Sequence, residues 1–110
     1  MEKTVVINGI TYKPVIDPSE VTLVRTYSAG VHFGEVMTQD GRNVVLKNAR
    51  RLWSWKGACS LSQVAIDGVN LNESKISVTV PTITLTEAIE LIPMSKKASA
   101  QMMGAAPWKK

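Results

Sequence analysis

Basic and aromatic residues gather in one window in the middle of the 110-residue chain. Between Gly41 and Ile66 the sequence contains five arginines or lysines, two tryptophans and no acidic residue. A guanidinium group holds phosphate oxygens through paired hydrogen bonds, and an indole ring offers a surface on which a base stacks. The window therefore indicates a site for a phosphate-bearing ligand. A basic face that only keeps the protein in solution is the competing explanation.

A second candidate for phosphate binding precedes this window. Arg25 and Tyr27 are two residues apart, so they share a face if the segment is a strand. The turn Ser28-Ala29-Gly30 follows at once, and free backbone amides beside an arginine can hold a phosphate. In the alternative interpretation, Tyr27 packs in the core and Arg25 pairs with Glu35 across a hairpin.

Within the basic window, the order of the residues predicts which way they point. Arg50 and Arg51 are adjacent, so on a continuing strand they face opposite sides, one toward a ligand and the other toward a subunit contact. Trp53 and Trp55 would share a face, an arrangement more frequent in cores and interfaces than in base-stacking platforms. The residues predicted to contact a ligand are Arg25, Tyr27, Arg50, Arg51, Trp53, Trp55 and Lys56.

The sequence offers little for catalysis. His32 is the only histidine and Cys59 the only cysteine, which excludes an internal disulfide and any site that needs several of either residue. We expect His32 to be an exposed or core-edge strand residue, and a Cys59–His32 dyad is the alternative. The spacing of Glu87 and Glu90 does not suggest a metal, and no phosphate-binding glycine loop opens a helix. We therefore expect no enzyme activity, no cofactor and no metal.

Composition places the chain among single-domain globular proteins. The net charge is +4 and 45% of the residues are hydrophobic, enough to bury a core without a disulfide or metal. The longest apolar run is well short of the roughly 18 residues of a membrane span. The N-terminus lacks the basic and apolar regions of a signal peptide. We expect a cytoplasmic protein with no membrane contact.

The pattern of residues predicts mainly β-structure in the first half of the chain. Thr4 to Lys13 predicts a hairpin turning at Asn8-Gly9, and the prolines that follow make residues 14–20 a connector. Three strands then form an antiparallel meander, with Gly34 marking a sharp bend inside the second. Their expected ranges are Val21–Tyr27, Val31–Thr38 and Arg42–Ala49, the last running on toward Trp53.

The second half mixes short helices with strands. Ser60 and Gln63 form a capping box for a helix from about Leu61 to Asp67, which Gly68 ends. Strands are expected over Ile76–Val80 and over Ile83–Ile92, although the second also fits a helix. Ser95 caps a last helix that reaches about Met103 and stops at Gly104. The basic tail after it is expected to be mobile unless a partner subunit holds it.

The middle of the chain resembles the Sm-like small barrels. The resemblance rests on Gly30, on Gly34 in mid-strand, on Asp40 in an acidic turn and on the following VVLKNA strand. It covers residues 21–53, with Ile83–Ile92 as a closing strand, and differs in its N-terminal hairpin and helical insert. The resemblance implies a small SH3/Sm-like barrel, to which the residue pattern adds an N-terminal hairpin, a short helical insert near residues 60–68 and a short C-terminal helix. The expected single domain then divides into a hairpin (1–13), a barrel core (21–93) and a C-terminal helix with a basic tail (94–110).

Another resemblance concerns the origin of the protein. The segment RTYSAGVHFGEV, followed by VVLKNARRLWSWKGACSLSQVA, is similar to a family of small bacteriophage proteins over residues 21–93. This resemblance implies a viral origin and no obvious enzyme chemistry, so the expected cytoplasmic location would be the host cytoplasm.

Together these observations favour a non-enzymatic binding protein. In this hypothesis, barrels assemble through their edge strands into a homo-oligomer that binds an anionic nucleotide. Sequestering a host immune signal nucleotide, as a counter-defence, is its most concrete form. One alternative is Sm-like binding of single-stranded RNA or DNA, and another is a virion or assembly protein without a ligand.

Overall fold

Three consecutive strands form the antiparallel meander that the sequence predicts. In the computed structural model, which describes residues 5–7, 10–12 and 20–108, these are β3 (Thr22–Thr26), β4 (Val31–Asp40) and β5 (Asn43–Ser54). Before them, β1 (Val5–Ile7) and β2 (Ile10–Tyr12) pair as the expected antiparallel hairpin. The predicted Asn8-Gly9 turn and most of the connector 14–20 lie outside the described residues.

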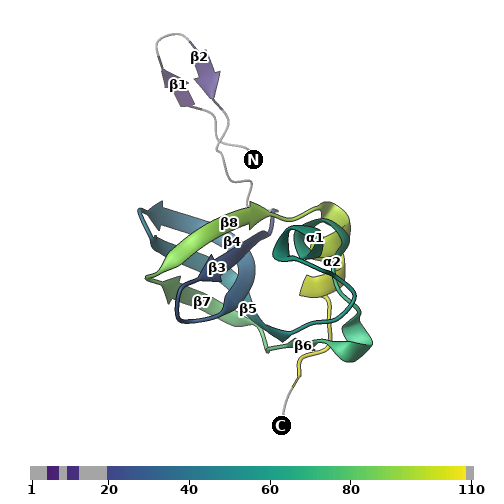
Figure 1. Cartoon of the computed structure of the whole chain (residues 1–110). Coiled ribbons are helices and arrows are strands. Elements are labelled where there is room, and N and C mark those ends of the chain that lie inside the picture. Colours follow the sequence, from purple (N-terminus) through teal and green to yellow (C-terminus); the bar gives the residue numbers. More distant parts are fainter. Residues whose placement is uncertain (1–4, 8–9, 13–19, 109–110) are drawn as a thin grey trace.

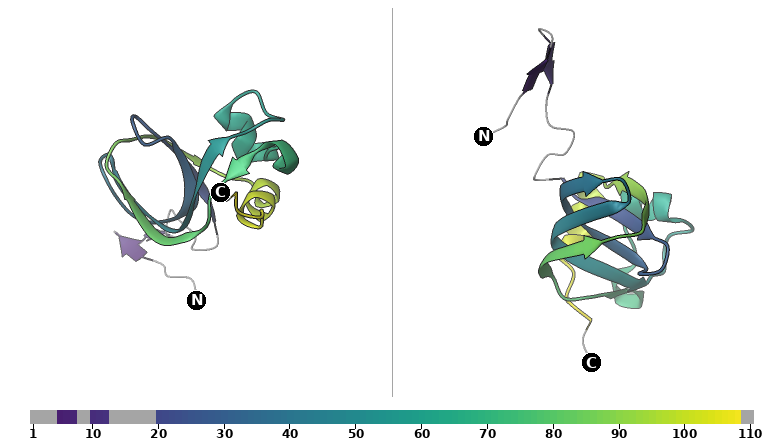
Figure 2. Two further views of the ribbon diagram at one scale, coloured as in Figure 1. Left: turned by 90° about the horizontal axis from the view of Figure 1, so that it is seen from below. Right: turned by 90° about the vertical axis from the view of Figure 1, so that its left-hand side faces the viewer.

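The remaining strands close the meander into a barrel. β6 (Lys75–Ile76) and β7 (Val80–Leu85) both pair with β5, and β8 (Ala88–Pro93) pairs with β3 on the far side. The left view of Figure 2 shows the strands curving around a ring, with the helices outside it. The chain is therefore mainly β and forms a small barrel, as expected.

Both faces of the barrel wall are buried on the side that the helices cover. The helices α1 (Leu61–Asp67) and α2 (Lys96–Met103) pack against each other on one flank of the barrel (Figure 1). Val24 packs inside the barrel, whereas its neighbour Leu23 packs outside, beneath the helices, and both are fully buried. Adjacent residues on one strand thus serve two separate cores.

A close approach of two backbones bends the barrel at Gly34. Phe33 pairs with Arg50 and Glu35 pairs with Lys47, so β5 has one residue more than β4 across this step. Asn48, in the bulge, has a φ of 52° and donates from its side-chain amide to Glu35 Oε2 at 2.8 Å. A Cβ on Gly34 would lie 2.9 Å from the carbonyl oxygen of Lys47. The expected bend at Gly34 is confirmed, and the bulge opposite it is its structural partner.

The two helices begin and end where the capping residues predict. Ser60 Oγ accepts from the Gln63 amide at 3.2 Å, and Gln63 Oε1 accepts from the Cys59 amide at 2.8 Å. Ser95 Oγ accepts from the Ala98 amide at 3.0 Å, and α2 stops at Gly104. Within the described residues, no helix has the length and apolar character that crossing a membrane would require.

The structure corrects three boundaries. The expected strand Ile76–Val80 is interrupted at residues 77–79, which leave the regular ladder although Ser77 still bonds to Arg51 of β5, and Val80 instead begins β7. The expected strand Ile83–Ile92 is two strands with a break at residues 86–87, because the chain must turn from β5 to β3 to close the barrel. A short 3₁₀ helix, η1 (Leu71–Glu73), lies in the loop before β6.

The tail as far as Trp108 is placed beside β6, since the Trp108 amide donates to the Ile76 carbonyl at 2.7 Å.

We predict that Gly34→Ala destabilises the protein by about 1–3 kcal/mol, because the added methyl group meets backbone atoms that cannot move aside. Gly41→Asn is the matched control, since nothing lies within 4 Å of a Cβ at Gly41 and asparagine tolerates its φ of 59°. Urea unfolding of both variants measures the effect. Equal losses in the two variants would contradict the steric account of the bend.

Candidate functional site

A cavity of about 240 Å³ opens at the end of the barrel where β5 passes the bulge between β6 and β7. It is smaller than the roughly 300–1,000 Å³ of sites for drug-sized ligands, so it suits a single ring system. Aliphatic side chains form much of its wall, and one histidine, two arginines, one tryptophan and one serine contribute the rest. The lining residues are His32, Ala49, Arg50, Arg51, Trp53, Ser77, Val78, Val80 and Ile83.

Strand register brings the polar residues of this cavity together. His32 on β4 is paired with Arg51 on β5 and with Val24 on β3, so all three face the interior side of the wall. Trp53 lies two residues beyond Arg51 and shares this face. A cationic, an aromatic and a titratable side chain therefore meet at one end of the barrel.

The Arg51 guanidinium is held in place by two contacts. Its Nε donates to His32 Nε2 at 3.1 Å, and its Cζ lies 5.0 Å from the centroid of the Trp53 ring. The Nη atoms have no hydrogen-bond partner among the residues that the structure describes. Arg51 is thus positioned at the cavity with donors free to meet an anion.

The aromatic surface continues from the cavity to the C-terminal segment. The Trp53 and Trp108 rings meet edge to face with centroids 6.4 Å apart, and Lys75 Nζ lies 5.0 Å from the Trp108 centroid. Both indoles remain substantially exposed, Trp53 at 55% and Trp108 at 44%. We call Arg51, Trp53, Trp108 and Lys75 the basic–aromatic cluster. It places a positive charge at each end of an exposed pair of indoles.

His32 is the deepest polar side chain of the cavity. It is 1% exposed, and burial together with the neighbouring Arg51 charge lowers its pKa to about 4. The imidazole is therefore neutral at pH 7, and Arg51 engages one of its nitrogens. The other, Nδ1, is buried without a hydrogen-bond partner in the described part of the chain.

Arg50 is held by backbone carbonyls of its own chain. Its guanidinium is 3% exposed and donates to four carbonyl oxygens, those of Ser77, Met102, Met103 and Ala105, at 2.7–3.1 Å. Three of them lie at the C-terminal end of α2, where a cation is favourable. Burial lowers the pKa of Arg50. The expectation that Arg50 and Arg51 point opposite ways is confirmed, but Arg50 contacts its own chain.

Trp55 and Lys56 lie away from the cavity. Because β5 ends at Ser54, Trp55 does not continue the alternation and instead packs, partly buried, against the helix-side core. The expectation that Trp53 and Trp55 share a face is wrong for this reason. Lys56 is exposed, and its backbone bonds to Ser74 Oγ and to the Asn70 amide.

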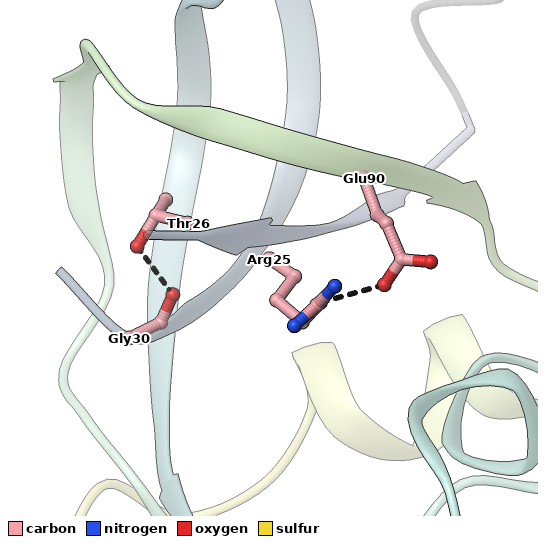
Figure 3. Close-up of polar contacts among 4 residues, drawn as sticks. All are labelled: Arg25, Thr26, Gly30 and Glu90. Carbon is pink, nitrogen blue, oxygen red and sulfur yellow. Dashed lines mark hydrogen bonds and ion pairs between the residues drawn. The ribbon is translucent and has the colours of Figure 1, made fainter. Parts of the chain in front are cut away.

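The Arg25 site is occupied by acidic groups of the chain itself. Arg25 Nε lies 2.7 Å from Glu90 Oε1, and Figure 3 shows the two side chains meeting from neighbouring strands. This ion pair replaces the pairing with Glu35 considered above. Tyr27 is 78% exposed, so the alternative that it packs in the core is wrong.

The polar groups of the turn after Arg25 also form hydrogen bonds within the chain. Thr26 Oγ1 donates to the Gly30 carbonyl at 2.7 Å (Figure 3) and accepts from the Ala29 amide at 2.9 Å. The Ser28 hydroxyl bonds to the Glu87 carboxylate. A phosphate at this turn would meet carboxylates and few free amides, so the geometry favours the cavity instead.

The structure separates the two residues of the alternative dyad. Cys59 is exposed in the segment before α1, which packs outside the barrel, whereas His32 faces its interior. No group of three histidine, cysteine, aspartate or glutamate side chains is arranged to hold a metal ion in the ranges that the structure describes.

Several cavity residues were not predicted from the sequence. Ser77 and Val78 belong to a bulge that their spacing does not reveal, and Lys75 and Trp108 join the cluster only because the C-terminal segment returns to β6. The one available signal was the second acid-free stretch after Glu90, which carries Trp108 among its lysines.

A family model described as "Domain of unknown function (DUF6948)" matches residues 19–102. The chain belongs to this family. The matched segment holds the barrel, α1, most of α2 and every cavity-lining residue, whereas Trp108 lies beyond it. No curated protein and no solved structure matches the chain. Membership of the DUF6948 family therefore assigns no activity to the chain.

We predict that Arg50→Lys lowers the free energy of unfolding by about 2–4 kcal/mol, because one ammonium group cannot reach all the carbonyls that the guanidinium fork satisfies. Arg42→Lys, at an exposed turn position, is the control and should change stability by less than about 0.5 kcal/mol. Chemical unfolding measures both variants. A loss for Arg50→Lys no larger than the control's would show that the buried fork is not needed.

We predict that stability falls as the pH is lowered from about 6.5 to about 4, since the unfolded histidine takes up a proton near pH 6.5 and folded His32 does not until about pH 4. Between about pH 8 and pH 5 this linkage costs about 2 kcal/mol. Urea unfolding at both pH values measures the loss, with His32→Gln as the control. If His32→Gln loses as much stability as the parent protein, the histidine is not responsible.

Proposed function

We propose that the protein binds a nucleotide-type anion, with the base in the barrel-end cavity and the phosphate at its rim. The observation that carries this proposal is the Arg51 guanidinium, which lies over Trp53 beside a ring-sized cavity and keeps its Nη donors unpaired in the described chain. Arginine donors of this kind recognise phosphate, and the indole beside them recognises a planar ring.

The dimensions of the site support a single base. A cavity of about 240 Å³ with aliphatic walls accepts one flat ring system, a pyrimidine or a purine, and leaves no room for a second base. The ribose and phosphate would remain outside, near Arg51 and the exposed face of the basic–aromatic cluster. Lys75, at the far end of that cluster, adds a second positive charge for a longer phosphate chain.

The chemistry of the cavity supports binding without turnover. The Nε2 lone pair of neutral His32 is already engaged by Arg51, and an arginine side chain has no hydrogen-bond acceptor. No lining side chain is therefore free to act as a general base. We include in the proposal a counter-defence role, in which retention of a host signal nucleotide is the activity, and this role accords with the viral origin that the resemblance to bacteriophage proteins implies. Self-association through edge strands stays a prediction.

We predict that one mononucleotide binds per barrel and that Arg51→Gln and Trp53→Leu each weaken binding about tenfold or more, in line with 1–3 kcal/mol for stacking of one base. Isothermal titration calorimetry with AMP, IMP, CMP and UMP measures this. The matched control is Arg42→Gln, which removes the same charge from an exposed turn outside the cavity.

Three outcomes would count against this proposal. Absence of binding by all four nucleotides at micromolar concentration would overturn it. Equal weakening by Arg42→Gln would show a nonspecific charge effect. Affinity that rises with the length of a single-stranded oligonucleotide and falls steeply with salt would favour the nucleic-acid alternative.

A further inference from the structure

We propose that His32 selects the base, by donating a hydrogen bond from Nδ1–H to a carbonyl oxygen on the ring that enters the cavity. The ligand class is then an oxo-substituted base, such as hypoxanthine or uracil, in preference to the matching amino-substituted base. This inference rests on the proposed function, because it names the group that the same cavity recognises.

The position of the proton follows from the hydrogen bond that His32 already makes. Arg51 has no acceptor atom, so its Nε must be the donor to His32 Nε2, and that nitrogen must carry a lone pair. A neutral imidazole holds one proton, and only Nδ1 remains to carry it. The arginine therefore fixes the tautomer and makes Nδ1 a hydrogen-bond donor.

This donor is unsatisfied within the described chain. His32 is 1% exposed and lines the cavity, and no described residue accepts a hydrogen bond from Nδ1. Buried polar groups in native proteins nearly always have a partner, so an orphan of this kind calls for an explanation. Because the imidazole lines the cavity, a ligand atom that enters deeply enough to reach Nδ1 would supply one.

The depth of His32 decides which part of the ring it meets. The phosphate must stay at the rim, near the exposed members of the basic–aromatic cluster, so the edge of the base farthest from the ribose enters first. On that edge hypoxanthine and uracil carry a carbonyl oxygen, where adenine and cytosine carry an amino group. An amino group would place a donor against the Nδ1–H donor, whereas a carbonyl accepts from it.

The first test uses the fact that His32 is the only histidine in the chain. Its two ring nitrogens can be observed by ¹⁵N NMR in the free protein without resolving any overlap. We expect a protonated Nδ1 and an unprotonated Nε2, and a shift of the Nδ1 signal when IMP or UMP is added. A protonated Nε2 in the free protein would overturn the inference whether or not nucleotides bind.

The second test compares affinities within two matched pairs, IMP against AMP and UMP against CMP. We expect the oxo member of at least one pair to bind at least about fivefold more tightly, as for a buried donor left without an acceptor. His32→Phe should abolish this preference, and His32→Gln should keep it because an amide can both accept from Arg51 and donate to the ligand. Calorimetry at pH 7 gives the ratios.

The outcomes separate this inference from the function on which it rests. Binding of all four nucleotides with no preference, or with a preference for AMP and CMP, leaves the proposed function standing and overturns the role of His32. Absence of all binding overturns the proposed function, and the inferred selectivity falls with it. If His32→Phe does not fold, the tautomer and the affinity ratios of the parent protein still decide the question.

Discussion

The backbone approach at Gly34 is the constraint from which the site follows. With no side chain at Gly34, β4 can pass within contact distance of the β5 backbone, and the bulge at Asn48 takes up the extra residue. That bulge sets the phase of every residue after it in β5. Because successive strand residues face opposite sides, a shift by one residue would exchange the places of Arg50 and Arg51.

Arg50 and Arg51, which are adjacent on β5, have different surroundings. Arg50 faces the helices and ties the end of α2 and the Ser77 carbonyl to the barrel, so its charge is satisfied by the fold. Arg51 faces the cavity and is oriented by His32 and Trp53, which leaves the tip of its guanidinium for a ligand. Ser77 connects both, since its hydroxyl also accepts from the Arg51 amide at 2.7 Å. The arginine that ties α2 to the barrel and the arginine proposed to bind the ligand are thus adjacent residues of β5.

The sequence predicted those features that depend on local chemistry. Strands, helix caps and the bend at Gly34 follow from alternation, from Ser60 and Ser95 and from a glycine in mid-strand. The opposite orientation of Arg50 and Arg51 also follows from alternation, and Arg51 and Trp53, two of the residues predicted to contact a ligand, line the same cavity. Other features depend on which strands become neighbours in the fold, and a single sequence does not contain the strand order. They are the ion pair of Arg25, the exposure of Tyr27 and the position of Trp108. The role of His32 could not be predicted for the same reason, because its tautomer follows from the strand register that places it opposite Arg51.

Occupancy of the cavity beside Arg51 and Trp53 by a nucleotide is tested most directly by the indole signals of the protein. The chain has three tryptophans, whose side-chain N–H groups give three separate signals in a ¹H–¹⁵N spectrum. During titration with a mononucleotide, we expect the Trp53 and Trp108 signals to move together along one binding curve, while Trp55, packed against the helix-side core, stays in place. No movement of Trp53, or an equal movement of Trp55, would contradict the account.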